Sequence, residues 1–348
     1  VETFAPNTVS ALGLPSVLST NLSGIPAAVA MAKGASTVIM AVGTNLDFAA
    51  EGHDAVNVSV PYGQARLVEA VADAAAAPIT IVLFTANPLD VSAWMANPKI
   101  GAVLLVGQPS VGVLGVANVL FGGKAPAGRT VQTVYPEAYA NEISIFDFNM
   151  RPGPSAYDRP DCPREDWGKC EKGTNPGRTH RFYTGTPVVP FGFGLSYTTF
   201  NYSHAAVRTN RGDGSVSLRP VREVLAQSKG SFVSLAAVDA MAPLVQYSVK
   251  VTNTGAVDAD DVVLGFLVPP GAGKGGVPLQ TLFGFDRVHV RAGETVTVDL
   301  YPQATDFMIT RENGNKTVVE GEYKVRFGIP EALDHGMGFL ETTLTAHL

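Results

Sequence analysis

The hydrophobic pattern of this chain changes along its length, and the change limits the fold to two joined units of different class. Residues 36–42 (STVIMAV) and 79–84 are apolar runs of strand length, typical of strands buried on both faces. Between them, residues 63–77 carry apolar side chains at helical spacing, and Pro78 ends that pattern. Strands that alternate with helices over residues 25–135 predict a parallel sheet.

The C-terminal part of the chain has the different pattern of an all-β unit. Residues 244–252 (LVQYSVKVT) alternate, and the turn residues 253–255 (NTG) follow them. Further short strand-like segments occur at 262–268, 295–300 and 321–327. This spacing predicts a β-sandwich of about a hundred residues, which we place at 242–348. The Gly-rich residues 271–276 lack the strand–loop–helix context of a phosphate-binding loop and predict a turn.

The predicted boundaries divide the chain into four segments. Residues 1–24 form an N-terminal extension, residues 25–203 the α/β domain, and residues 204–241 a linker or peripheral segment before the sandwich. Inside the α/β domain, residues 136–189 are rich in Pro, Gly, Asp and Arg and show little periodicity. A long loop inside a compact domain is more often functional than accidental, so we expect this one to contribute to a site.

The composition is that of an ordinary globular protein. Of 348 residues, 46% are hydrophobic and 16% are charged, which leaves room for two or three domains. The net charge of −6 argues against nucleic acid or an anionic membrane as the main partner. No apolar run reaches the roughly 18 residues of a membrane span. The chain starts at Val1, without Met or a charged leader, which we interpret as a processed or truncated end.

Cys162 and Cys170 lie in a loop rich in Pro, Asp and Gly. Two thiols cannot complete a structural zinc site, so a local disulfide is the favoured interpretation and two free thiols are the alternative. The six histidines are scattered along the chain, and we predict no metal site and no cofactor. N-glycosylation sequons occur at Asn21, Asn57, Asn201 and Asn315. With a disulfide, they favour a protein of the secretory pathway: secreted, vacuolar or in the cell wall.

Ligands of a doubly wound sheet bind beyond the carboxyl ends of its strands, which selects the loops 43–60, 85–94 and 107–110. Only the first loop carries a dense polar set, which consists of Asn45, Asp47, Glu51, His53 and Asp54. Acid/base cleavage of a glycosidic bond needs a carboxyl group that holds a proton near neutral pH, and partial burial beside a cleft raises a Glu pKa. Glu51 is therefore a candidate, and a solvated loop carboxylate is the alternative.

Residues 190–200 (PFGFGLSYTTF) predict a turn followed by a strand. This run resembles the signature that closes the α/β sandwich domain of family 3 glycoside hydrolases. Residues 251–255 (VTNTG) and 282–285 (LFGF) resemble the fibronectin type III-like domain that ends many such enzymes. The resemblance implies an α/β sandwich with a mostly parallel sheet, followed by a fibronectin type III-like β-sandwich.

Residues 50–64 (AEGHDAVNVSVPYGQ) resemble the acid/base loop of that family. The match assigns the acid/base role to Glu51, and Asp47 and His53 of the same loop are expected to contact substrate. Two positions depart from the family pattern. Ala55 stands where an Arg is usual, and Ala49 stands where the plant and fungal β-xylosidase branch usually has a first Glu.

Residues 148–152 (FNMRP) and 175–183 (NPGRTHRFY) resemble the β-xylosidase and α-arabinofuranosidase branch of the family. That resemblance implies that Arg178, His180 or Arg181 lines the sugar cleft. The alternative is that these side chains only anchor the loop through salt bridges.

In this family the nucleophilic Asp belongs to a TIM-like barrel of about 250 residues. Nothing before residue 25 has room for a barrel. We therefore expect the C-terminal chain of a two-chain, retaining β-xylosidase-like exo-glycosidase, whose partner chain carries the barrel and whose substrate is an oligosaccharide. The alternative is a non-catalytic glycoprotein that keeps the fold for carbohydrate binding or assembly, which Ala49 and Ala55 favour.

Overall fold

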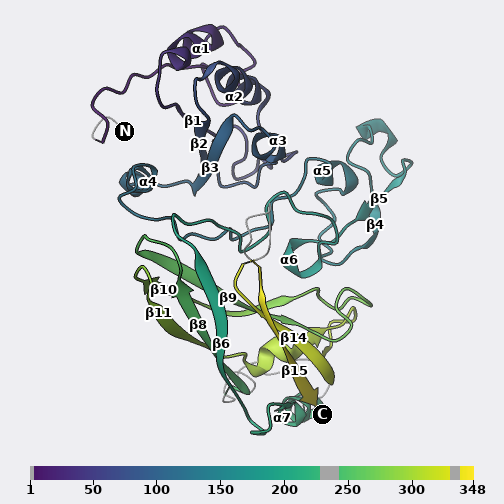
Figure 1. Ribbon diagram of the computed structural model, residues 1–348. Helices are drawn as coiled ribbons and strands as arrows, with labels where there is room; N and C mark the ends of the chain where they lie inside the picture. The colour runs from purple at the N-terminus through teal and green to yellow at the C-terminus, as the bar shows by residue number, and fades with distance from the viewer. Residues whose placement is uncertain (1–3, 228–242, 330–337) are drawn as a thin grey trace.

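The computed structural model describes residues 4–227, 243–329 and 338–348 (Figure 1). The chain forms an α/β part, then a loop-rich part with a projecting hairpin, and then a β-sandwich. The predicted class, α/β followed by a β-sandwich, is confirmed. Within the described ranges, no helix has the length and apolar character that a membrane crossing requires.

The α/β part contains a three-stranded parallel sheet with the order β1-β2-β3. Ile39 of β1 lies opposite Thr80 of β2, and Ile81 of β2 lies opposite Val103 of β3. Along the chain the elements are α1 (Ile25–Lys33), β1 (Ile39–Gly43), α2 (Tyr62–Ala74), β2 (Ile79–Phe84), α3 (Ser92–Met95), β3 (Ile100–Gly107) and α4 (Val113–Leu120). The parallel arrangement follows from the helical crossover between consecutive strands.

Helix α2 packs an apolar stripe onto the sheet. Its residues Leu67, Val68 and Val71 are buried together with Ile79 and Ile81 of β2. A spacing of three to four residues places the helical side chains on one face, as the sequence predicted. Burial of each such side chain stabilises the fold by roughly 1.5–3 kcal/mol. This packing fixes the helix that follows the Glu51 loop.

Residues 136–189 contain short elements where a long loop was expected. These are α5 (Tyr139–Glu142), β4 (Gly153–Asp158), a 3₁₀ turn (Arg164–Asp166), β5 (Lys172–Asn175) and α6 (Thr179–Phe182). Strands β4 and β5 form an antiparallel hairpin. A disulfide joins Cys162 to Cys170 between the two strands, so the favoured interpretation of these cysteines holds and neither thiol is free.

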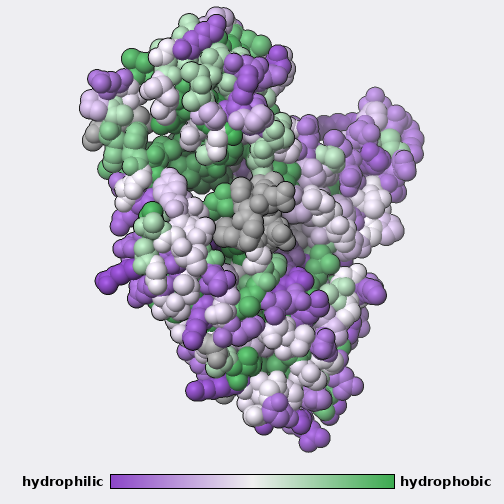
Figure 2. Space-filling view, in the orientation of Figure 1, coloured by the Kyte–Doolittle hydropathy of each residue, from purple (hydrophilic) through white to green (hydrophobic). Residues whose placement is uncertain are grey.

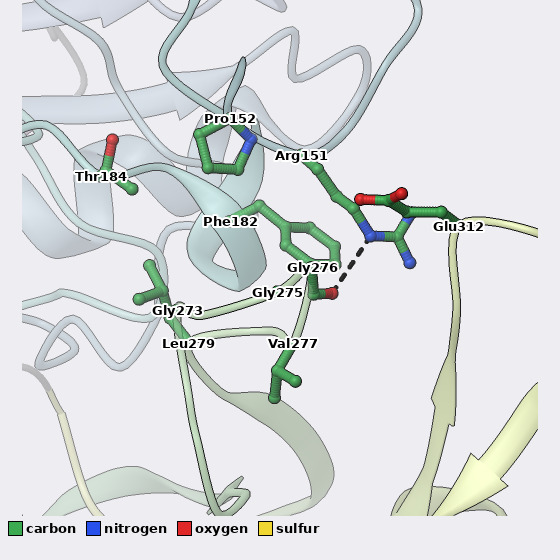
Figure 3. A pocket seen from close by; sticks show the side chains of 10 residues that line it. All are labelled: Arg151, Pro152, Phe182, Thr184, Gly273, Gly275, Gly276, Val277, Leu279 and Glu312. Atoms are coloured by element: carbon green, nitrogen blue, oxygen red, sulfur yellow. Dashed lines mark hydrogen bonds between the residues drawn. The ribbon is translucent and has the colours of Figure 1, made fainter.

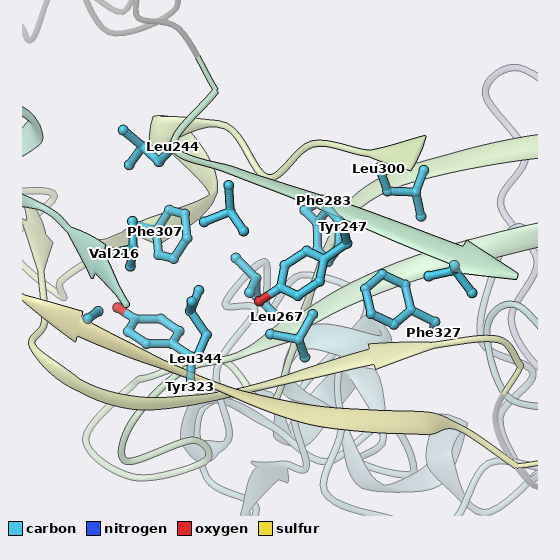
Figure 4. Close-up of a cluster of buried hydrophobic side chains, with 14 of the residues drawn as sticks. Val216, Leu244, Tyr247, Leu267, Phe283, Leu300, Phe307, Tyr323, Phe327 and Leu344 are labelled. Atoms are coloured by element: carbon cyan, nitrogen blue, oxygen red, sulfur yellow. The ribbon is translucent and has the colours of Figure 1, made fainter. Parts of the chain in front are cut away.

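The β-sandwich packs a five-stranded sheet, β10-β9-β14-β15-β7, onto a three-stranded sheet, β11-β8-β6. Its strands are β6 (Phe200–Thr209), β7 (Val216–Ser217), β8 (Val245–Asn253), β9 (Ala259–Val268), β10 (Thr281–Val290), β11 (Thr295–Leu300), β14 (Gly321–Phe327) and β15 (Leu340–His347). Figure 4 shows the core, in which Tyr247, Phe307, Tyr323 and Phe327 are fully buried. The alternating burial of β8 matches the alternating sequence that predicted it.

The segment 204–241 differs from the expected linker. Strand β6 pairs along β8, β7 joins β15, and helix α7 (Arg219–Gln227) follows. Val216, Leu218 and Val221 belong to the sandwich core, so the sandwich begins near residue 200 instead of 242. The local pattern could not reveal this because β6 and β7 are stabilised by partners far along the chain, β8 and β15. Residues 228–241 of the expected linker lie outside the described residues.

Candidate active site

One buried side chain, Gln64 at the start of α2, holds the carboxyl end of β1. The Gly43 N–H donates to Gln64 Oε1 (2.7 Å), and Gln64 Nε2 donates to the carbonyls of Gly43 (2.7 Å) and Val17 (2.9 Å). Gly43 also lies tightly against β2, where a Cβ would stand 1.8 Å from the Phe84 carbonyl oxygen. The loop that carries Glu51 therefore leaves the sheet from a fixed point.

Glu51 lies at the tip of a tight turn in this loop. The Ala50 N–H donates to the His53 carbonyl (2.8 Å), and the His53 N–H donates to the Ala50 carbonyl (3.0 Å). Gly52 has a φ of 74°, whereas the φ of Glu51 is not positive, which is the combination of a type II turn. The Glu51 side chain is exposed, so the turn presents a carboxylate at the surface beyond the sheet edge.

Asp47 and His53 flank the same turn. Asn45 Nδ2 donates to Asp47 Oδ2 (2.9 Å), and the Asp47 N–H donates to Asn45 Oδ1 (3.1 Å). His53 Nε2 lies 3.2 Å from the Asp47 carbonyl oxygen. The structure thus brings three of the predicted site residues, Asp47, Glu51 and His53, together on one loop, where backbone and side-chain hydrogen bonds order them.

The Glu51 loop is also tied to the loop after β2. The hydroxyls of Thr44 and Thr85 lie 2.7 Å apart, and the Asp90 N–H donates to the Val58 carbonyl (2.7 Å). Asp90 Oδ2 in turn accepts the Glu137 N–H (2.7 Å), which links both loops to the loop-rich part. The loops after the first two strands therefore meet at one sheet edge, as expected for a parallel sheet.

Arg178 lies beside a cluster of tyrosines. The rings of Tyr135 and Tyr139 stack at 4.1 Å, and Tyr183 meets Tyr135 edge-on at 4.9 Å. Burial raises the pKa of Tyr139 to about 12, and the Arg178 cation opposes that rise in part. The Arg178 guanidinium donates to the backbone carbonyl of Asp147. Among the described residues Arg178 forms no ion pair, so its anchor differs from the salt bridge that we considered.

The backbone at Thr179 is strained, because its φ of 61° is costly for a β-branched residue. Its N–H donates to the Tyr135 hydroxyl (2.7 Å). At the neighbouring Gly177, a Cβ would lie 2.0 Å from the Phe182 carbonyl oxygen. The motif at 175–183 is therefore a tight turn that the tyrosine cluster supports. Sequence reasoning missed Tyr135 and Tyr139, since no local pattern links them to Thr179.

His180 and Arg181 lie at the junction with the sandwich. The His180 ring stacks on Phe191 at 4.1 Å and meets Phe266 of β9 edge-on at 6.0 Å. Burial lowers the pKa of His180 to about 4, and the Arg181 cation adds to this effect. The Arg181 carbonyl accepts the Leu279 N–H (2.7 Å). The structure thus gives His180 a packing role between two parts of the chain.

The predicted glycosylation positions lie at the surface. The asparagines of all four sequons are exposed: Asn21, Asn57, Asn201 and Asn315. Over the part of the chain that the structure describes, no group of three or more His, Cys, Asp or Glu residues could hold a metal ion.

The chain thus combines an α/β domain, with a polar loop beyond its sheet edge, and a β-sandwich. Residues 8–197 match the glycosyl hydrolase family 3 C-terminal domain, and residues 261–329 match the fibronectin type III-like domain. The first match spans more than half of the chain. The chain therefore belongs to glycosyl hydrolase family 3.

Relatives in this family are β-xylosidases by name. The chain is 32% identical to the probable exo-1,4-beta-xylosidase bxlB of Aspergillus terreus, over 89% of this chain and 36% of that protein. It is 30% identical to Beta-D-xylosidase 1 of Arabidopsis thaliana, over 92% of this chain and 40% of that protein. The chain thus spans about two fifths of the length of these relatives.

Solved structures share the fold. A GH3 exo-beta-xylosidase (XlnD), in complex with a xylobiose aziridine activity-based probe, has a TM-score of 0.75 and 26% identity. That comparison covers 97% of this chain and 39% of the solved chain. A GH3 beta-glucosidase of Bifidobacterium adolescentis matches with a TM-score of 0.68 at 23% identity, which shows the fold alone.

Proposed function

We propose that this chain supplies the acid/base side of a retaining exo-glycosidase, with Glu51 as the general acid/base. The observation that carries the proposal is the position of Glu51 on an ordered, exposed turn beyond the carboxyl end of β1, in a family 3 C-terminal domain. In a retaining mechanism, one carboxylic acid protonates the leaving oxygen. As a carboxylate it then activates water against the covalent glycosyl-enzyme.

In this proposal, the nucleophilic carboxylate is not one of the described residues. We assign it to a barrel-containing chain of the same precursor. An apolar surface on the α/β part supports such a partner, because Val111, Val113 and Leu114 at α4 and Leu105 of β3 are exposed, Val111 by 94%. Figure 2 shows hydrophobic residues gathered on the lower side of this part in that view. Contiguous exposed apolar surface marks an interaction site.

The proposed substrate is an oligosaccharide with a terminal β-D-xylose or a related sugar. The names of the relatives, exo-1,4-beta-xylosidase and Beta-D-xylosidase, support this class. The disulfide and the four exposed sequons support a location in the secretory pathway, the cell wall or the vacuole.

A second candidate function is non-catalytic carbohydrate binding or structural assembly on the same fold. The observation that favours it is the absence of charged groups at Ala49 and Ala55, which flank the Glu51 turn. Without them the loop offers fewer groups to orient a sugar beside Glu51.

Native mass spectrometry of the unfractionated preparation tests the partner first. A barrel-containing chain present in equal amount supports the proposal, and its absence favours the non-catalytic alternative. Hydrolysis of 4-nitrophenyl β-D-xyloside by the complex then tests Glu51. We expect Glu51→Gln to lose activity and Glu69→Gln, at an exposed Glu of α2, to keep it. Equal activity of both variants would refute the assignment of Glu51.

A further inference from the structure

A separate cavity lies where the loop-rich part meets the sandwich. It encloses about 250 Å³, and both parts of the chain line it (Figure 3). Arg151, Phe182 and Thr184 contribute from the loop-rich part, and Gly276 and Glu312 contribute from the sandwich. No residue of the Glu51 loop lines this cavity. Its Gly-rich wall is the segment 271–276, for which the sequence predicted only a turn.

Arg151 is held in place at one side of the cavity. Its Nε donates to the Gly276 carbonyl (3.1 Å), its Nη2 donates to the Thr310 carbonyl, and its guanidinium carbon lies 5.3 Å from the centroid of the Phe182 ring. A Cβ at Gly276, where φ is 72°, would stand 2.9 Å from Arg151 Nε, so this approach requires glycine. A guanidinium has five N–H donors, and these two bonds leave the others for a ligand.

Glu312 supplies an acceptor of opposite charge. It lies on the exposed turn between β12 (Met308–Thr310) and β13 (Lys316–Val318), and Figure 3 shows its carboxylate on the same side of the cavity as the Arg151 guanidinium. Among the described residues the two form no ion pair. The lining thus carries one cation and one anion, so it has no net charge that would favour an anion or a cation as ligand. A neutral ligand with several hydroxyl groups, by contrast, satisfies both at once.

We propose that this cavity binds one unit of a neutral sugar, a pentose or a hexose. The hydroxyl oxygens of the sugar accept hydrogen bonds from the Arg151 guanidinium. The hydroxyl groups of the sugar donate hydrogen bonds to the Glu312 carboxylate. The Thr184 hydroxyl, whose own hydrogen bonds to the Pro176 carbonyl (2.9 Å), is free to accept another. At roughly 30 Å³ per water molecule the cavity holds about eight waters. It is smaller than the sites of drug-sized ligands, so it fits one sugar ring instead of a chain.

Calorimetric titration of the purified chain with D-xylose, and then with D-glucose, tests the site. We expect weak, saturable binding with one ligand per chain. Glu312→Ala removes a charged acceptor and is expected to weaken binding about tenfold or more. Glu322→Ala, at an exposed Glu of β14, is the matched control and leaves the affinity unchanged. Glu51→Gln leaves it unchanged as well, which separates this site from the proposed catalytic function.

Three results would overturn the proposal. The first is no saturable binding of either sugar to a chain whose thermal unfolding is normal. The second is binding that Glu51→Gln abolishes and Glu312→Ala does not, which would place the sugar on the Glu51 loop. The third is that sulfate displaces the sugar both from the unsubstituted chain and from Glu312→Ala, which would make the cavity an anion site. Loss or retention of glycoside hydrolysis affects none of these outcomes.

Discussion

Arg129 of the α/β domain and Asp261 of β9 form an ion pair that is almost closed to solvent, with side-chain exposures of 8% and 0%. The Tyr202 hydroxyl donates to the second carboxylate oxygen, and Arg129 Nη1 donates to the Gly194 carbonyl (3.2 Å). Burial and the Asp261 carboxylate keep the pKa of Tyr202 well above its usual range, so its hydroxyl stays a donor. These contacts fix the sandwich to the domain that carries Glu51.

Removal of the Asp261 carboxylate should strongly destabilise the fold. Asp261→Ala leaves Arg129 buried without a partner, and breaking a buried pair in this way costs about 3–5 kcal/mol. The neighbouring Asp260 forms partly exposed pairs with Arg287 and His289, so Asp260→Ala should cost less than about 1 kcal/mol. Urea unfolding of both variants measures the difference. Similar losses of unfolding free energy in the two variants would show that the buried pair stabilises the fold no more than the partly exposed pairs do.

Gln64 should matter for both stability and the proposed activity. Gln64→Leu leaves the Gly43 N–H and carbonyl without their partner at the buried end of β1, and an unsatisfied buried group costs about 1–3 kcal/mol. The Glu51 loop would lose its fixed origin, so hydrolysis by the complex should fall as well. Gln108→Leu, at an exposed position after β3, should stay within about 0.5 kcal/mol of the unsubstituted chain. Chemical denaturation and xyloside hydrolysis together check this, and a fully active Gln64→Leu complex would contradict it.

His180 should make stability depend on pH. Its pKa is lowered by burial to about 4, whereas the unfolded chain takes up the proton near its ordinary value of 6.5. The unfolded state therefore binds more protons between these values, and stability is lost as the pH falls from about 6.5 to 4. At about 1.4 kcal/mol per pKa unit, the loss reaches about 3 kcal/mol.

The difference between the unsubstituted chain and one variant isolates this effect from other titrating groups. Burial raises the pKa of Asp306 to about 6, which acts in the opposite direction over part of the same range. His180→Phe keeps the ring packing on Phe191. It should reduce the decrease in unfolding free energy that the unsubstituted chain shows as the pH falls. The unsubstituted chain, measured over the same pH range, is the reference for this variant. Parallel profiles for the unsubstituted chain and His180→Phe would exclude the effect.

The elements that the sequence predicted well are those whose pattern is local. The buried runs at β1 and β2, the stripe of α2 and the alternation of β8 all bury side chains with the period of their own backbone. The extent of strand β6 beyond Phe200 was missed because its ladder depends on β8, and β7 was missed because two residues have no period. Here the tertiary partner, not the local sequence, determines the structure.

The same division holds for the candidate site. Asp47, Glu51 and His53 lie within seven residues, so a single loop motif could place them together. His180 was assigned to the sugar cleft because its motif resembles one of the β-xylosidase branch, whereas its packing partners in the structure, Phe191 and Phe266 of the sandwich, could not be predicted from that motif. Contacts between segments so far apart in the chain leave no local pattern that sequence reasoning can detect.

The proposed acid/base role of Glu51 makes a prediction that a structural role does not. With 4-nitrophenyl β-D-xyloside, the leaving group departs without much proton donation, so Glu51→Ala should mainly slow the second step, in which water attacks the glycosyl-enzyme. General acid–base catalysis contributes typically about 10²–10⁴-fold, and kcat of the complex should fall by that order. KM should fall with it, because the covalent intermediate accumulates.

Azide should then restore turnover in Glu51→Ala, because it is an anionic nucleophile that needs no general base. It replaces water, breaks the bond between the sugar and the enzyme carboxylate, and releases β-xylosyl azide with retained configuration. Xylobiose should show no rescue, since its poor leaving group still needs the lost proton donor. Glu69→Ala serves as the matched control and should show neither the loss nor the rescue. A Glu51→Ala complex that loses activity without azide rescue would leave Glu51 only a structural part of its turn.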